Sequence, residues 1–84
     1  MREPREAIRQ YILTEFLPGE SPANLADDTP LRTTGILDSN TTLKLVDYIE
    51  REFGIEVEAR DLKEDNIGTI NALVAFIERC VAAK

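Results

Sequence analysis

The stretch TTGILDSNTTLKLV, residues 33–46, decides how the middle of this chain folds. A glycine and two aliphatic residues lead into the pair Asp38 and Ser39, and from Ser39 onward the apolar residues recur with helical spacing. Aspartate and serine are both preferred helix N-caps, so either one could begin a helix here. The alternative is that Ser39 stands exposed at the helix start in order to be modified.

The helix predicted over residues 39–53 is amphipathic. Leu43 lies off its apolar face, one turn after Ser39, which makes this leucine a candidate contact for a partner. Gly54 is expected to end the helix, because glycine readily adopts the left-handed conformation of a helix C-terminus. The residues predicted to face the core are Leu45, Val46, Ile49 and Phe53.

An earlier helix is predicted over residues 4–17, starting at Pro4 and ended by Pro18 and Gly19. A connection over about residues 18–38 follows, which is long for a small domain, and such loops are often functional. Within it DDTPL, residues 27–31, reads as a turn followed by a hydrophobic anchor. The apolar residues expected to pin the connection to the core are Leu25, Leu31, Ile36 and Leu37.

The last third of the chain predicts an extended link, a short helix and a long helix. Ile55 and Val57 alternate with polar residues, but no second strand is available to pair with them. A short helical turn is expected over residues 61–65, and Thr69 is the predicted N-cap of the last helix. Its inward residues are Ile70, Leu73, Val74, Ile77 and Val81. The fold class is therefore all-α, with three long helices and one short one, and residues 1–84 are expected to form a single domain.

Composition excludes several functions. The net charge of −6 argues against nucleic-acid binding, which needs clustered Lys and Arg. The absence of histidine removes Ser-His-Asp and Cys-His catalysis and histidine-based zinc sites, so we expect neither an enzyme nor a metal site. No apolar run approaches the roughly 20 residues of a membrane span, and the N-terminus lacks a signal-peptide core. Cys80 is the single cysteine and is expected to pack in the core. Together these features favour a cytoplasmic protein.

The order of these segments resembles that of acyl carrier and peptidyl carrier proteins. The resemblance covers nearly the whole chain and is carried by DDTPL (27–31), GILDS (35–39), LKLVDYIEREFGIEV (43–57) and DNIGTINAL (65–73). It implies an acyl-carrier-like four-helix bundle in which Ser39, preceded by Asp38, receives a 4′-phosphopantetheine arm from coenzyme A. The thiol of that arm would hold acyl or aminoacyl groups as thioesters. Because the chain offers no base to activate Ser39, a magnesium-dependent phosphopantetheinyl transferase would attach the arm.

The resemblance also implies partners. They are the transferase, an acyl- or aminoacyl-activating ligase, and downstream acyl-transferring or tailoring enzymes, all visited by a monomeric carrier. Partner contacts are expected at Asn40, Leu43, Asp47 and Glu50. Asn40 stands where the family usually has Leu or Met, and positions often acidic are occupied by Thr41, Lys44 and Arg51. This mixed charge disfavours the acid-to-base docking of fatty acid synthesis. The approach TTGILDS, residues 33–39, resembles more closely free-standing aminoacyl or peptidyl carriers, including D-alanyl carriers, and carriers of secondary-metabolite pathways. The resemblance therefore implies a free-standing carrier of a specialised pathway, of the secondary-metabolite, nonribosomal peptide or polyketide type or for D-alanyl transfer.

Two other readings stay open at this point. One is a housekeeping carrier of fatty acid synthesis. The other is a non-covalent helical-bundle interaction module, in which Leu43 and the pinned loop supply an apolar patch. An enzyme is a third class and is disfavoured, since it would need Asp and Glu pairs alone, with or without a metal. DLKEDN, residues 61–66, lacks the glycine and the glutamate spacing of a calcium loop.

Overall fold

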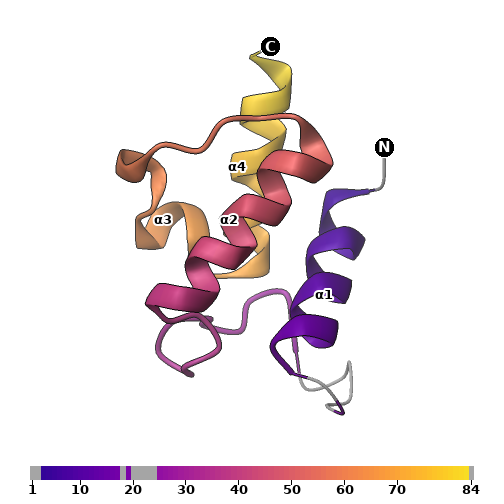
Figure 1. Cartoon of the computed structure of the whole chain (residues 1–84), viewed down its shortest axis with the longest axis vertical. Helices are drawn as coiled ribbons and strands as arrows, with labels where there is room; N and C mark the ends of the chain where they lie inside the picture. The colour runs from indigo at the N-terminus through magenta and orange to yellow at the C-terminus, as the bar shows by residue number, and fades with distance from the viewer. Residues whose placement is uncertain (1–2, 18, 20–24, 84) are drawn as a thin grey trace.

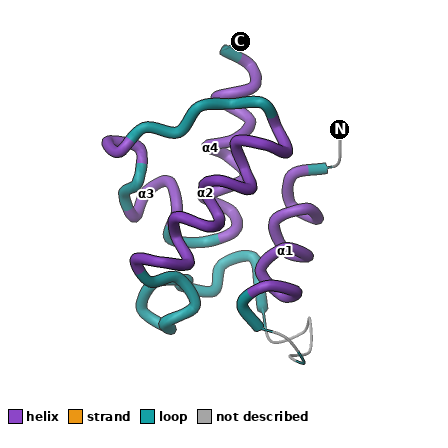
Figure 2. The backbone as a smooth tube through the Cα atoms, in the orientation of Figure 1, coloured by secondary structure: helices purple, strands orange, loops and turns teal. Residues whose placement is uncertain are grey.

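The computed structural model describes residues 3–17, 19 and 25–83, and these residues form an all-helical fold. The helices are α1 (Pro4–Glu15), α2 (Ser39–Phe53), α3 (Glu64–Ile67) and α4 (Ile70–Ala82), with a 3-10 turn, η2 (Ala59–Asp61), before α3. Within the described ranges there is no strand, and Figure 2 colours these residues as helix or loop only. The predicted all-α class, with three long helices and one short one, is confirmed.

Helix α4 is the centre of the bundle. It packs against α1, α2 and α3, and Figure 1 shows α1 and α3 on either side of α2 with α4 behind it. Thr69 caps α4 as predicted, because its hydroxyl accepts a hydrogen bond from the Ala72 amide at 3.0 Å. A centrally placed helix lets the described residues bury one continuous core.

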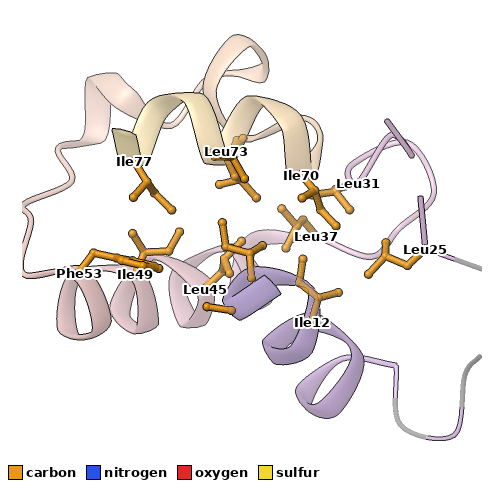
Figure 3. Packing of buried hydrophobic residues seen from close by; sticks show 14 of the residues in the cluster. Ile12, Leu25, Leu31, Leu37, Leu45, Ile49, Phe53, Ile70, Leu73 and Ile77 are labelled. Atoms are coloured by element: carbon orange, nitrogen blue, oxygen red, sulfur yellow. The ribbon is translucent and has the colours of Figure 1, made fainter. Parts of the chain in front are cut away.

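The core forms where α4 faces α2 and α1. Figure 3 shows Ile70, Leu73 and Ile77 of α4 pointing toward side chains of α2 and α1, and all three are buried. The predicted inward residues that are fully or nearly fully buried are Leu45, Ile49, Phe53, Ile70, Leu73, Val74 and Ile77. Val46 and Val81 are only half-buried at the edges of the two helices. The apolar pattern therefore identified the core, and the partly exposed valines mark its margin.

The predicted helix boundaries hold best where a capping signal is local. Helix α2 begins at Ser39 and ends at Gly54, whose φ of 65° is the left-handed conformation that glycine tolerates. Helix α1 begins at Pro4 but ends at Glu15, with Phe16 as its C-cap, two residues before the predicted end. Pro18 lies outside the described residues.

The short helix was predicted too early in the chain. Instead of one turn over residues 61–65, the chain forms η2 and then α3, three residues later than expected. The Asn66 side-chain amide donates to the Asp61 carbonyl at 2.9 Å and so joins the two turns. Ile67, at the end of α3, is 4% exposed. Burial of Ile67 thus accounts for the later position of the helix, since a turn ending at residue 65 would not include Ile67.

The connection before α2 is pinned to the core, as predicted. Leu25, Leu31 and Leu37 are buried, and Figure 3 shows them reaching the core from the loop, while Ile36 is half-buried. The Leu31 amide donates to the carbonyl of Gly68 at 2.8 Å, which ties the loop to the turn between α3 and α4.

Helix α1 holds the same connection through a cluster of charges. Arg5 Nη1 lies 2.9 Å from Asp27 Oδ2, and Arg9 forms an ion pair with the same carboxylate. Arg9 also donates to the Leu25 carbonyl, and the Asp27 carbonyl accepts from the Asn71 amide at 3.0 Å. The start of DDTPL is therefore fixed between α1 and α4 by side-chain and backbone contacts together.

We expect Leu31→Ala to destabilise the fold by about 2–5 kcal/mol, because a fully buried leucine is lost where the loop meets the core. Urea unfolding at neutral pH measures this change. Thr33→Ala is the matched control in the same loop, since Thr33 is exposed, and it should stay within about 0.5 kcal/mol of the native chain. Equal effects of the two substitutions would contradict the anchoring role of Leu31.

Candidate functional site

The start of α2 assigns different roles to Asp38 and Ser39. Asp38 is the N-cap: its Oδ1 accepts a hydrogen bond from the Thr41 amide at 2.9 Å. In return the Thr41 hydroxyl accepts one from the Asp38 amide at 2.8 Å, which completes a capping box. Of the two candidate caps left open by the sequence, Asp38 is therefore the one used.

Ser39 is exposed as the first residue of α2. The Ser39 hydroxyl makes no hydrogen bond to any residue in the described part of the chain. The helix start does not depend on this side chain, because Asp38 and Thr41 satisfy the cap. A group bound to the Ser39 oxygen would therefore displace no contact that holds the fold.

The Asp38 carboxylate is occupied by its capping role. Hydrogen bonds from the Thr41 backbone, and next from the Thr41 side chain, lower the pKa of Asp38 below its ordinary value. A carboxylate with a lowered pKa is a weak general base, and this one already accepts the hydrogen bonds of the helix start. Asp38 is therefore poorly suited to act as a general base toward the neighbouring Ser39 hydroxyl.

A groove with a volume of about 660 Å³ opens beside Ser39. It is formed by the loop before α2, the first turns of α2, and the segment from η2 to α3. Its apolar residues are Leu37, Leu43, Leu62 and Ile67, and its polar residues are Arg32, Thr33, Asp38, Ser39 and Thr42. The exposed hydroxyl thus lies at the edge of a partly apolar groove, an arrangement typical of sites for extended organic groups.

Two predicted partner-contact residues lie near Ser39 and are open to solvent. Asn40 follows Ser39 directly and is exposed. Leu43 is 62% exposed, which makes it the only large hydrophobic side chain classed as exposed among the described residues. An apolar side chain in that position, on the groove and next to the serine, is suited to contact with a partner.

The other two predicted contact residues also have partners inside the chain. Asp47 Oδ2 lies 3.3 Å from Arg51 Nε, an ion pair one helical turn apart. Glu50 is half-buried, and its carboxylate accepts a hydrogen bond from the Val57 amide at 2.8 Å. Asp47 is therefore partly neutralised and Glu50 holds the link after α2. Their contact with other proteins stays a prediction.

Sequence reasoning missed the groove residues that are distant from Ser39 along the chain. Leu62 and Ile67 reach the groove through the η2–α3 segment, and Arg32 reaches it through the loop. The link between Leu31 and Gly68 brings the loop and the α3–α4 turn together. No local pattern reveals such a pairing, because neither hydrogen-bonding group belongs to a side chain.

The single cysteine, Cys80, behaves as a packing residue. It is half-buried against the core, and burial raises the pKa of its thiol, which keeps it in the less reactive protonated form. Within residues 3–17, 19 and 25–83, no helix has the length and apolar character needed to cross a membrane.

Comparisons with known proteins identify a family and a similar fold. The model of a family described as "Phosphopantetheine attachment site" matches residues 8–77. A chain in a crystal structure described as an FAD-dependent dehydrogenase superposes with a TM-score of 0.77 at 26% identity, covering 83% of this chain and 97% of that one. Among curated proteins nothing matches.

The capping role of Asp38 predicts a pH dependence of stability. Because its pKa is lowered in the folded state, Asp38 stabilises the fold fully above its unfolded pKa of about 3.9, and this stabilisation is lost as the pH falls through the folded value. Asp38→Asn keeps a good cap but cannot titrate. Unfolding midpoints measured from about pH 7 down to pH 2.5 should therefore fall more steeply for the native chain.

Far-ultraviolet circular dichroism of Asp38→Asn at neutral pH is the control, and it should match that of the native protein. Parallel pH profiles for the two proteins would mean that the charge of Asp38 contributes nothing to the helix start.

Proposed function

The chain belongs to the family of phosphopantetheine attachment domains, and on this basis we propose that Ser39 is the attachment point of 4′-phosphopantetheine. The proposal is supported by the exposure of Ser39 at the first position of α2 and by the capping box that makes its hydroxyl dispensable to the fold. It is also supported by the groove that opens beside this residue. Asp38 is the neighbour that fixes the serine in place.

The attachment step uses the Ser39 oxygen as the nucleophile. That oxygen forms a bond to the phosphorus that carries the pantetheine, the pyrophosphate bond of coenzyme A breaks, and 3′,5′-ADP leaves. A base of the transferase takes the hydroxyl proton, since Asp38 is committed to the cap. Once attached, the arm supplies a thiol that carries acyl or aminoacyl groups as thioesters.

The protein is a carrier that holds phosphopantetheine. Domains of this family are in general substrates of other enzymes rather than catalysts, and they interact with phosphopantetheinyl transferases and partner enzymes. We infer that this chain is loaded by an acyl- or aminoacyl-activating ligase and unloaded by acyl-transferring or tailoring enzymes. We further propose that residues 1–84 form one monomeric carrier domain in the cytoplasm.

The pathway proposed is a specialised biosynthetic one. Carriers of fatty acid synthesis present acidic residues on the second helix to basic partners, whereas here Asp47 is paired with Arg51 and Glu50 binds the Val57 amide. Lys44 is exposed on the same helix. This pattern favours partners that do not rely on a basic docking face. The likeness to a chain in a structure of an FAD-dependent dehydrogenase makes an oxidising tailoring enzyme one candidate.

The test of the attachment point is the intact mass after incubation with coenzyme A, magnesium and a broad-specificity phosphopantetheinyl transferase. The native chain should gain the mass of one phosphopantetheine, and Ser39→Ala should gain none. Thr42→Ala is the matched control, because Thr42 carries a second hydroxyl on the same groove, and it should gain the same mass as the native chain.

An unmodified but folded native chain would overturn the proposal and favour the non-covalent interaction module. A mass gain by Ser39→Ala would instead place the attachment at another residue. Circular dichroism of each protein before the reaction separates these outcomes from loss of the fold.

The contact role of Leu43 gives a second test. Leu43→Ala should leave the fold intact, since the side chain is 62% exposed, but slow transferase-catalysed attachment. We expect kcat/KM to fall about 5- to 30-fold, the effect of losing roughly 1–2 kcal/mol of contact with the partner. Lys63→Ala, an exposed change outside the groove, should leave kcat/KM unchanged. Equal rates for Leu43→Ala and the native chain would remove Leu43 from the contact surface.

A further inference from the structure

The groove beside Ser39 contains a cation with no partner in the described part of the chain. The Arg32 side chain is exposed and lines the groove, and within residues 3–17, 19 and 25–83 it forms no ion pair or hydrogen bond. Other arginines of the fold are engaged: Arg5 and Arg9 with Asp27, Arg51 with Asp47, Arg60 with Glu58, and Arg79 with Asn66. Arg32 is therefore available to an anion in the groove.

Two backbone amides at the start of α2 are already engaged within the helix cap. The Thr41 amide donates to the Asp38 carboxylate and the Thr42 amide to the Asp38 carbonyl, so these donors of the first turn are occupied. The carboxylate of Asp38 also places a negative charge directly before Ser39. A phosphodiester on the serine would meet this like charge, and the cation lining the same groove is Arg32.

The backbone around Arg32 is held on both sides. Leu31 is anchored to Gly68, and the Leu37 amide donates back to the Leu31 carbonyl at 2.8 Å, which closes the loop. Inside it the Gly35 amide donates to the Arg32 carbonyl at 3.1 Å, and Gly35 itself has a φ of 82°. With its backbone fixed, Arg32 gives up only side-chain freedom when it binds an anion, which lowers the entropy cost.

We propose that Arg32 binds the phosphodiester of the arm on Ser39 and so positions the arm in the groove, against Leu62 and Ile67, between visits to partner enzymes. This inference rests on the proposed attachment at Ser39. Arginine suits the role because its planar guanidinium forms paired, charge-assisted hydrogen bonds with phosphate oxygens. Arg32 is a positioning residue and takes no part in forming or breaking a bond.

The groove fits the arm in size and chemistry. Its volume of about 660 Å³ lies within the roughly 300–1,000 Å³ of small-molecule sites. Leu62 and Ile67 offer apolar contact to the methyl and methylene groups of pantetheine, while Thr33 and Thr42 offer hydroxyls to its amides. The occupant is thus the arm of this same chain, tethered at the edge of the groove, so its effective concentration there is high.

The experiment compares apo and holo proteins, the latter fully converted by the transferase and checked by intact mass. Methyl and amide NMR shift changes at Leu62 and Ile67 on conversion report whether the arm occupies the groove, and the phosphorus-31 shift reports on the phosphodiester. In the native protein both residues should shift. In Arg32→Gln the changes should fall by at least half, while Arg32→Lys, which keeps the charge, should retain more of them.

Lys44→Gln is the matched control, because Lys44 is an exposed cation near Ser39 in sequence that does not line the groove. Its holo form should give the native shift changes. Raising the salt from about 0.05 M to about 0.5 M should shrink the changes in the native protein more than in Arg32→Gln, because salt screens the ion pair. The apo spectra of the variants should otherwise match the native spectrum.

Three outcomes would overturn the proposal: shift changes of native size in holo Arg32→Gln, no change at Leu62 and Ile67 in the native protein, or changes that are insensitive to salt. If Arg32→Gln failed to fold, the salt dependence of the native protein would still decide the matter. Failure of the attachment proposal is distinguishable, because it appears beforehand as the absence of a mass gain that depends on Ser39.

Discussion

The hydrogen bond from the Leu31 amide to the Gly68 carbonyl, beside the buried Leu31 side chain, is the contact on which the site depends. It fixes the loop before α2 to the turn that joins α3 and α4. The groove beside Ser39 lies between this loop and the η2–α3 segment. Residues 25–38 of the long connection therefore have a defined structure, held by buried leucines and backbone hydrogen bonds.

The same end of the molecule separates the residues that cap α2 from the proposed attachment point. Asp38 and Thr41 complete the helix start, and Ser39, one residue further, is left exposed and outside the cap. A carrier that is modified and then visits several enzymes needs this division, because a group attached to a capping residue would disturb the helix each time it moved. The ion pairs of Arg5 and Arg9 with Asp27 contribute to this arrangement, because they hold the loop that leads to Asp38.

Partner recognition by α2 is limited by what its side chains do within the fold. Considered on the helix alone, Glu50 and Asp47 suggest an acidic docking face. In the fold, however, Glu50 accepts a hydrogen bond from the Val57 amide, and Asp47 forms an ion pair with Arg51. The residues left open near Ser39 are Asn40, Leu43 and Lys44, a polar, an apolar and a basic side chain. This composition favours contacts led by shape and apolar area over long-range attraction between acidic and basic surfaces.

The sequence by itself determined the long helices, most of the core and the candidate serine. Their signals are local: helical spacing from Leu45 to Phe53, a capping signal at Asp38 or Ser39, a stop at Gly54, and a resemblance carried by ordered motifs. The structure shows that the local capping box with Thr41 selects Asp38, and not Ser39, as the cap of α2. Tertiary packing decided the position of the short helix, where burial of Ile67 competed with local preference.

Tertiary structure also decided the groove and the place of Arg32 in it. These features arise from backbone hydrogen bonds between segments more than 30 residues apart. Such bonds cannot be predicted from side-chain patterns, because every residue except proline carries the same backbone donor and acceptor.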